Sequence, residues 1–328
     1  MTVDNPTDHS TAPARPTQNG GPFVPEASST LAALSTEGRN PRTVDLDTLD
    51  TLRLLEVIND EDRLVADAVR AELPSIARAV ERITEARRRG GRLIYLGAGT
   101  SGRIGLLDAV ECPPTFGTDP SEVLGLIAGG EHAFVVAVEG AEDDIELGAS
   151  ELIAADLRPT DVVVGLAASG RTPYVIGGLR YARHLGAGTI AVSCNRNARI
   201  SAEADIAIEV MTGPEALTGS TRLKAGTAQK LVCNMLSTAS MVRSGKVFSN
   251  LMVDVKPTNE KLVDRAQRIV ADATGVERSI ADDALEQAGA HAKTAVVMLL
   301  ADVDAATAAR LLESHDGDVR SSVAAASA

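Results

Sequence analysis

Two copies of one local pattern constrain the fold of this chain more than any other feature. Each copy is a short apolar segment, then a turn of small residues, then a Ser-Gly-Arg tripeptide. The copies occupy residues 92–103 (RLIYLGAGTSGR) and 162–172 (VVVGLAASGRT). An apolar run of four or five residues before such a turn is typical of a buried strand. Ser101 is a good N-cap for the amphipathic run 104–112, and a helix is expected over 173–184. Each copy therefore predicts a strand–turn–helix unit.

The two turns together predict an anion site. Free N–H groups and the positive end of a helix dipole meet where a glycine turn leads into a helix. The first copy also fits the dinucleotide pattern G-x-G-x-x-G, but that pattern needs one turn and an acid for the ribose, whereas here two turns carry hydroxyls. Ordinary βα turns with serine caps are the alternative for either copy alone. For the pair we favour a cradle for one phosphate and a sugar, made by Thr100, Ser101, Gly102, Ser169, Gly170 and Thr172.

Three more apolar segments, residues 124–128, 189–194 and 206–210, alternate with helical stretches. This alternation predicts an α/β fold with a doubly wound parallel sheet flanked by helices, with ligand sites at the carboxyl ends of the strands. Helices are expected before the first strand, with a break at 59–62 and a new start at Pro74. Residues 1–42 lack periodicity and are expected to be a tail that is disordered or loosely draped over the domain. Residues 43–258 are expected to form the α/β domain, and the alanine-rich residues 259–328 a small helical domain.

Composition limits the class of protein. Of 328 residues, 44% are hydrophobic but only 2% aromatic, with no Trp, so the core must be aliphatic. The net charge of −13 argues against a nucleic-acid surface or an anionic membrane as partner. The three cysteines are scattered and lack metal-type spacing, which fits a reducing cytoplasm and predicts no metal site. No signal peptide and no apolar run of about 18 residues is seen.

Residues 211–230 (MTGPEALTGSTRLKAGTAQK) form the densest polar segment of the chain. They concentrate cations and hydroxyls between glycines, and a helix is expected to follow over 225–242. We interpret the segment as a wall of the site that supplies cations to an anionic or polyhydroxyl ligand, with an exposed loop as the alternative. The candidate ligand-binding residues in it are Glu215, Ser220, Arg222 and Lys224.

Two glutamates lie at positions where the predicted local structure does not favour or explain a carboxylate. Glu111 is predicted at the C-terminal end of a helix stopped by Pro113 and Pro114, where the helix dipole disfavours a carboxylate. Glu142 lies in an acidic turn in which helix capping accounts well for Asp143 and Asp144 but less well for Glu142. Solvated surface carboxylates are the alternative for both.

The motifs GAGTSGR, DAVECPPTFG, GLIAGGE, AVEGAED, AASGRTPYVIGGL, GSTRLKAGTAQKLV and KVFSNLMVDVKPTNEKL resemble those of the N-acetylmuramic acid 6-phosphate etherases, in the same order and from about residue 35 onward. The resemblance implies the sugar-isomerase (SIS) phosphosugar-binding fold. It also implies cleavage of the D-lactyl ether at C3 of the sugar in cytoplasmic peptidoglycan recycling, without metal or redox cofactor. The family's catalytic glutamates fall on Glu111, implied to be the proton donor to the departing lactate, and on Glu142, implied to be the base.

Other functions and the assembly can be weighed on the same residues. A phosphosugar-binding regulator shares the fold but has no need of both glutamates, and a phosphosugar isomerase has no use for an acid at C3. A dinucleotide oxidoreductase would bind NADH, and we expect no NADH binding.

Ten residues of helix separate Ser101 from Glu111, a length of about 15 Å, which exceeds the distance from phosphorus to C2 in a hexose 6-phosphate. We therefore expect a homodimer with the site at its interface.

Overall fold

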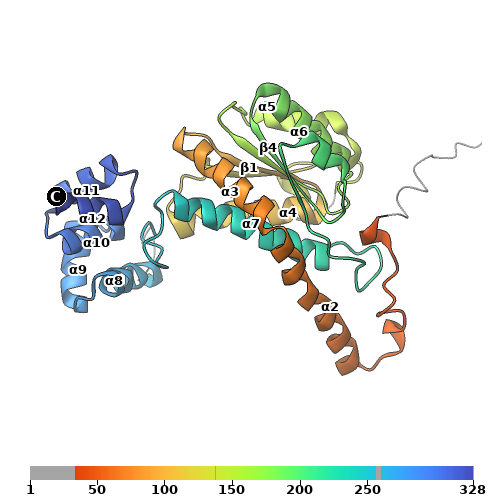
Figure 1. The fold of residues 1–328 in the computed structure, drawn as a ribbon, viewed down its shortest axis with the longest axis horizontal. Helices are drawn as coiled ribbons and strands as arrows, with labels where there is room; N and C mark the ends of the chain where they lie inside the picture. Colours follow the sequence, from red (N-terminus) through yellow and green to blue (C-terminus); the bar gives the residue numbers. More distant parts are fainter. Residues whose placement is uncertain (1–33, 137, 256–259, 328) are drawn as a thin grey trace, which may run out of the picture.

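The computed structural model describes residues 34–136, 138–255 and 260–327 (Figure 1). Within them, five parallel strands form one sheet in the order β2-β1-β3-β4-β5. The strands are β1 (Leu93–Gly97), β2 (Val123–Ile127), β3 (Val162–Leu166), β4 (Gly188–Ser193) and β5 (Ile206–Glu209). The predicted doubly wound parallel sheet is confirmed, and each predicted strand lies within a residue or two of its observed position.

Helices cover both faces of the sheet. Figure 1 shows α5 (Ile145–Ala154) and α6 (Pro173–Leu185) on one side, with α3 (Leu73–Arg88), α4 (Gly99–Phe116) and α7 (Lys224–Arg243) on the other. Alternate strand residues supply the two aliphatic cores: Leu93 and Tyr95 face α3, α4 and α7, while Ile94 and Leu96 face α5 and α6. Both faces of a parallel sheet are buried in this arrangement, which explains the unbroken apolar runs of its strands.

Two predicted helix ends are wrong. The helix α2 runs without a break from Thr51 to Ala71, because the side chain of Glu61, in the predicted break, is buried against α7 rather than solvated. The helix α4 continues through Pro113 and Pro114 to Phe116, since proline φ is helical and burial of Cys112 and Phe116 offsets the lost hydrogen bonds. Between β2 and α5 the chain forms a short 3₁₀ helix, Glu131–Phe134.

The predicted tail is partly ordered. Residues 1–33 lie outside the described residues, but residues 34–42 pack on the domain. Thr36 and Asn40 are buried, and the Ser35 amide donates to Asn195 Oδ1 at 2.8 Å. These nine residues are therefore packed rather than disordered, and Ser35, Thr36 and Asn40 have partners on the loops that follow β4 and β5.

The C-terminal part of the chain forms a separate group of helices, drawn in blue in Figure 1, beyond the ends of α4 and α7. They are α8 (Glu260–Thr274), α9 (Arg278–Gln287), α10 (Ala292–Ala301), α11 (Ala305–Ser314) and α12 (Val319–Ala326). Their aliphatic core also includes Val253 and Val255. The predicted domain boundary at 258–259 falls among residues 256–259, outside the described residues. No helix in the described part of the chain is long and apolar enough to cross a bilayer.

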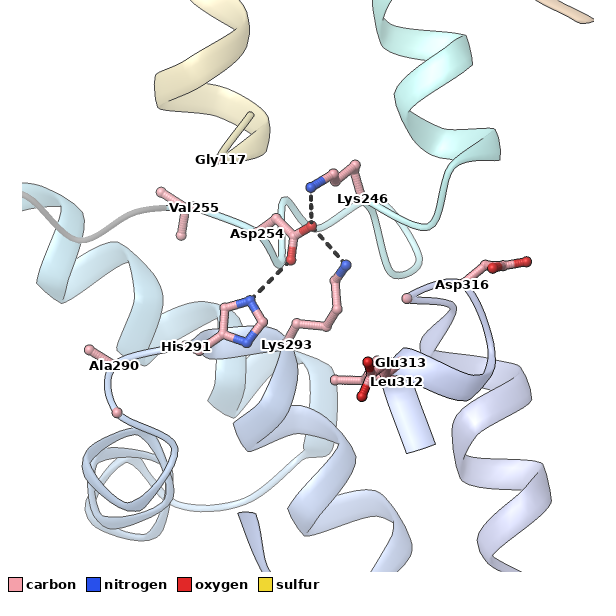
Figure 2. A pocket seen from close by; sticks show the side chains of 12 residues that line it. Gly117, Lys246, Asp254, Val255, Ala290, His291, Lys293, Leu312, Glu313 and Asp316 are labelled. Carbon is pink, nitrogen blue, oxygen red and sulfur yellow. Dashed lines mark hydrogen bonds and ion pairs between the residues drawn. The ribbon is translucent and has the colours of Figure 1, made fainter. Parts of the chain in front are cut away.

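Charged side chains join this helical group to the segment that follows α7. The buried carboxylate of Asp254 pairs with Lys293 at 2.7 Å, Lys246 at 3.1 Å and His291 at 3.3 Å, beside a cavity of about 590 Å³ (Figure 2). Burial alone would raise the pKa of Asp254, but the hydrogen bond with His291 and the ammonium groups of Lys293 and Lys246 hold it below its ordinary value. A Cβ on Gly117 would lie 2.2 Å from the Asp254 carbonyl oxygen, so this junction packs tightly against the end of α4.

Candidate active site

The two Ser-Gly-Arg turns lie at neighbouring positions on the carboxyl edge of the sheet. Strands β1 and β3 pair in parallel, with Gly97 opposite Leu166 at their last residues. The chain leaves β1 toward β2 on one side and returns as β3 on the other, so the point between β1 and β3 is the topological switch point of the sheet. Ligands of open α/β sheets bind at such points. The fold therefore brings the two predicted turns together where a site is expected.

The first turn leads directly into α4. The N-cap is Ala98, which offers no side-chain acceptor, and Ser101 lies inside the first turn, so the prediction of Ser101 as N-cap is wrong. Its hydroxyl instead donates to Gln229 Oε1 on α7 at 2.8 Å. Gly102 must be glycine, because a Cβ there would lie 2.6 Å from the Gly97 carbonyl oxygen. No side chain in the described part of the chain caps the first amides of α4, so they are available to an anion.

The second turn leads into α6. Ser169 Oγ accepts from the amide of Arg171 at 3.3 Å, and Thr172 is the N-cap of α6 without a side-chain capping bond. Gly170 has φ +71°, and a Cβ there would meet Ala198 at 2.4 Å. Asn195 holds the turn, since its amide nitrogen donates to the Ala168 carbonyl at 3.2 Å. As at the first turn, none of the described residues caps the start of this helix with its side chain.

The polar segment before α7 divides into two parts. Glu215 is fully buried and caps α7, accepting from the amides of Lys224 at 2.8 Å and Ala225 at 2.9 Å. Burial raises the pKa of Glu215, and the two amides oppose that rise. Lys224 is also fully buried, with its Nζ 2.7 Å from Glu61 Oε2. Both side chains are buried and paired within the chain, and ligand binding by Glu215 and Lys224 stays a prediction.

The remaining part of that segment stays at the surface near the first turn. Arg222 is exposed and Ser220 is half-buried. The position for a Cβ on Gly226, in the first turn of α7, lies 3.6 Å from Thr100 and 3.7 Å from Ile104. The start of α7 therefore packs against the start of α4, so the loop that carries Ser220 and Arg222 ends beside the β1 turn.

Glu142 lies in a 3₁₀ helix, Ala141–Asp143, and is exposed. It lines a cavity of about 120 Å³ together with Gly99 and Arg103 of the first turn. The Arg103 guanidinium donates to the carbonyls of Ala133 and Phe134 at 2.8 Å each, which fixes the loop over the turn. As predicted, Asp144 caps α5, accepting from two amides of its first turn. Capping thus accounts for the neighbouring aspartate but not for Glu142.

Glu111 is exposed in the last two turns of α4 rather than at its end, so the predicted conflict with the helix dipole is weaker than expected. It lines a cavity of about 330 Å³ between α4 and α7. The other lining residues are Ile104, Leu107, Asp108, Lys230, Cys233 and Asn234. Glu111 and Glu142 thus line different cavities of one chain, and the structure does not bring them together within it.

Sequence reasoning missed Asn195 and Gln229, the two amides that hold the turns. Asn195 follows an apolar stretch, and Gln229 lies within the polar segment 211–230, where spacing alone assigns it no partner. Only the packing of distant segments, Asn195 against Ser35 and Gln229 against Ser101, gives these residues their roles. For Gln229 its place in the polar segment was the available signal, and for Asn195 we find none in the sequence.

Two family models match overlapping parts of the chain. The N-terminal SIS domain of glucokinase regulatory protein matches residues 75–183, and the SIS domain matches residues 135–239. These ranges cover all five strands of the sheet. The SIS fold predicted for the α/β domain is therefore confirmed.

Curated relatives match nearly the whole chain. The N-acetylmuramic acid 6-phosphate etherase of Mycolicibacterium smegmatis is 65% identical over 295 residues, which cover 90% of this chain and 99% of the relative. The protein of the same name from Serratia proteamaculans is 60% identical over 293 residues, covering 89% and 99%.

Solved structures are similar at a greater distance. A phosphoheptose isomerase from Neisseria gonorrhoeae is 17% identical with a TM-score of 0.45, covering 57% of this chain and 96% of its own. A phosphoheptose isomerase from Francisella tularensis is 17% identical with a TM-score of 0.44, covering 57% and 98%.

Proposed function

The chain belongs to the family of N-acetylmuramic acid 6-phosphate etherases, and from this we propose that it cleaves the D-lactyl ether of N-acetylmuramic acid 6-phosphate. The products are N-acetylglucosamine 6-phosphate and D-lactate. The enzyme is a carbon–oxygen lyase of amino-sugar recycling. The observation that carries the proposal is 65% identity over almost the full length of a named etherase. We place the reaction in the cytoplasm, where the free, buried Cys112, Cys194 and Cys233 would stay reduced.

The chemistry needs one base and one acid. The C2 proton of the open-chain sugar lies alpha to the C1 aldehyde, so a base can remove it. The C3–O bond then breaks, its electron pair stays on the lactate oxygen, and an acid supplies the proton. Water finally adds its hydroxyl to C3 of the unsaturated aldehyde and gives its other proton to the spent acid, while the base returns a proton to C2, so both groups end as they began. We assign the base to Glu142 and the acid to Glu111; both are exposed carboxylates that line cavities, as proton transfer requires.

We assign the phosphate to the two turns at the switch point. The uncapped first amides of α4, with the hydroxyls of Thr100, Ser169 and Thr172, offer donors to the phosphate. Ser101, whose hydroxyl donates to Gln229 Oε1, would exchange that hydrogen bond for one to the phosphate. Gly102 and Gly170 allow the close backbone approach. Ser220 and Arg222 extend this site from the α7 side. Glu215 and Lys224 support that loop from inside the domain.

Release of D-lactate tests the function. The purified enzyme with N-acetylmuramic acid 6-phosphate should release equal amounts of D-lactate and N-acetylglucosamine 6-phosphate, measured with D-lactate dehydrogenase and by mass spectrometry. Ring-opened isomerisation without lactate would instead indicate an isomerase. Tight binding without turnover would indicate a regulator.

We propose further that the enzyme is a homodimer with each site shared between two chains. An apolar groove of about 970 Å³ runs between α3 and α7, lined by Ile76, Val80, Leu231, Met235 and Val242 among others. A second copy would bury it and gain the hydrophobic free energy. The separate cavities of Glu111 and Glu142, and the length of α4 between Ser101 and Glu111, favour one glutamate reaching each site from the partner.

Mixing two inactive variants tests the shared site. Glu111→Ala and Glu142→Ala chains should each be inactive alone. After co-expression, a mixed dimer should have up to about half the activity of a wild-type dimer, because one of its two sites receives both intact glutamates. Differently tagged chains allow the mixed dimer to be purified. No activity in a mixed dimer of confirmed composition would exclude sharing.

A further inference from the structure

The cavity lined by Glu111 has acidic side chains on one wall and a cationic side chain opposite them. Two carboxylates, Asp108 and Glu111, line it from α4. Among the described residues that line it, only Lys230, across on α7, is cationic. An anion entering this cavity would meet like charges on one wall, so its binding requires a cation placed opposite.

Lys230 is held in place by a chain of hydrogen bonds that starts in the core. The Tyr95 hydroxyl donates to Asp108 Oδ2 at 2.8 Å, and Ser237 donates to Asp108 Oδ1 at 3.1 Å. With its amide oriented to suit its neighbours, Asn234 donates to Asp108 Oδ1 at 3.2 Å and accepts from Lys230 Nζ at 3.0 Å. This bond occupies one of the three ammonium donors and leaves two for a ligand in the cavity.

The substrate of the proposed function carries an anion at the matching point. The lactyl carboxylate is bonded to the same carbon as the ether oxygen that departs from C3. The acid that protonates this oxygen and the cation that pairs with the carboxylate must therefore stand within a few ångströms of each other. Glu111 and Lys230 line the same cavity of one chain, so they stay together whichever subunit supplies them.

We propose that Lys230 binds the lactyl carboxylate of the substrate and so selects ethers that carry an acid at this position. The inference rests on the proposed function. During the reaction Glu111 gives its proton to the ether oxygen as the C3–O bond breaks. Lys230 transfers no proton. It holds the carboxylate while the C3–O bond breaks and until the lactate leaves the cavity.

A substrate without the carboxylate tests this directly. The 3-O-ethyl ether of N-acetylglucosamine 6-phosphate differs from the natural substrate only by hydrogen in place of the carboxylate. Wild-type enzyme should prefer the natural substrate in kcat/KM by about 10–100-fold, the effect of one charge-assisted hydrogen bond. Lys230→Met should lose this preference, because its kcat/KM falls for the natural substrate and stays unchanged for the ethyl ether.

Matched variants make the outcomes distinct. Lys230→Arg should retain part of the preference, and Arg88→Met, an exposed cation at the end of α3, should retain all of it. Equal losses on both substrates in Lys230→Met would overturn the proposal, since they would assign Lys230 to packing or to Glu111 alone. A wild-type enzyme that cleaves neither ether would instead refute the proposed function.

Discussion

A Glu142→Gln variant should fold normally and lose about 10²–10⁴-fold in kcat, the range for removal of a general base. Gln keeps the size and polarity of the side chain but cannot accept the C2 proton. Because Glu142 is exposed and its side chain caps no helix in the described part of the chain, its loss should leave the melting temperature unchanged. Exchange of the C2 proton in D₂O, followed by NMR, reports on the base separately from lactate release.

The same measurement separates the two glutamates. Glu111→Gln should still exchange the C2 proton while releasing little lactate, because the base remains and the acid is gone. Glu146→Gln, an exposed acid in the first turn of α5, is the matched control and should behave as wild type. Retained exchange in Glu142→Gln together with lost exchange in Glu111→Gln would reverse the roles assigned here. Unchanged kcat in both variants would remove these residues from the mechanism.

The strands and the meeting of the two Ser-Gly-Arg turns could be predicted because their signals are local. Five short apolar runs between turns leave few alternatives to a parallel sheet, and the fold rule then places the turns after β1 and β3 at one edge. The helix ends could be predicted less well. Pro113 and Pro114 read as a stop, yet burial of Cys112 and Phe116 decides that the helix goes on.

The roles of the charged residues depended on contacts that sequence spacing does not encode. Arg222 and Lys224 look equivalent in the polar segment, but one is exposed and the other is enclosed by Glu61, more than 160 positions earlier. Likewise the Asn59–Asp62 stretch reads as a solvated break, although Glu61 within it is buried. A buried ion pair brings together two segments that each look like surface, and only the tertiary structure identifies it.

The burial of Lys224 predicts a role in stability, whereas the sequence predicts a role in ligand binding. Lys224→Met should destabilise the fold by about 3 kcal/mol, because it leaves the buried Glu61 carboxylate with a single cation, Arg42, at 2.9 Å from Glu61 Oε2. If Lys224 bound the ligand instead, the variant would keep its stability and raise KM. Urea unfolding followed by circular dichroism, with KM measured on the same preparation, distinguishes the two.

The pH dependence and a double variant test the same ion pair. The Arg42 guanidinium, opposed by burial and aided by Lys224, lowers the pKa of Glu61 to about 2. Since this pKa is lower folded than unfolded, the contribution is complete above the unfolded value of about 4.3 and is lost as pH falls toward 2. The difference in unfolding free energy between wild type and Lys224→Met should therefore narrow over that interval.

Adding Glu61→Gln to Lys224→Met should recover part of the loss of stability at pH 7, because it removes the buried charge that the first substitution leaves with too few partners. Strictly additive losses would mean that the two side chains do not act as a pair.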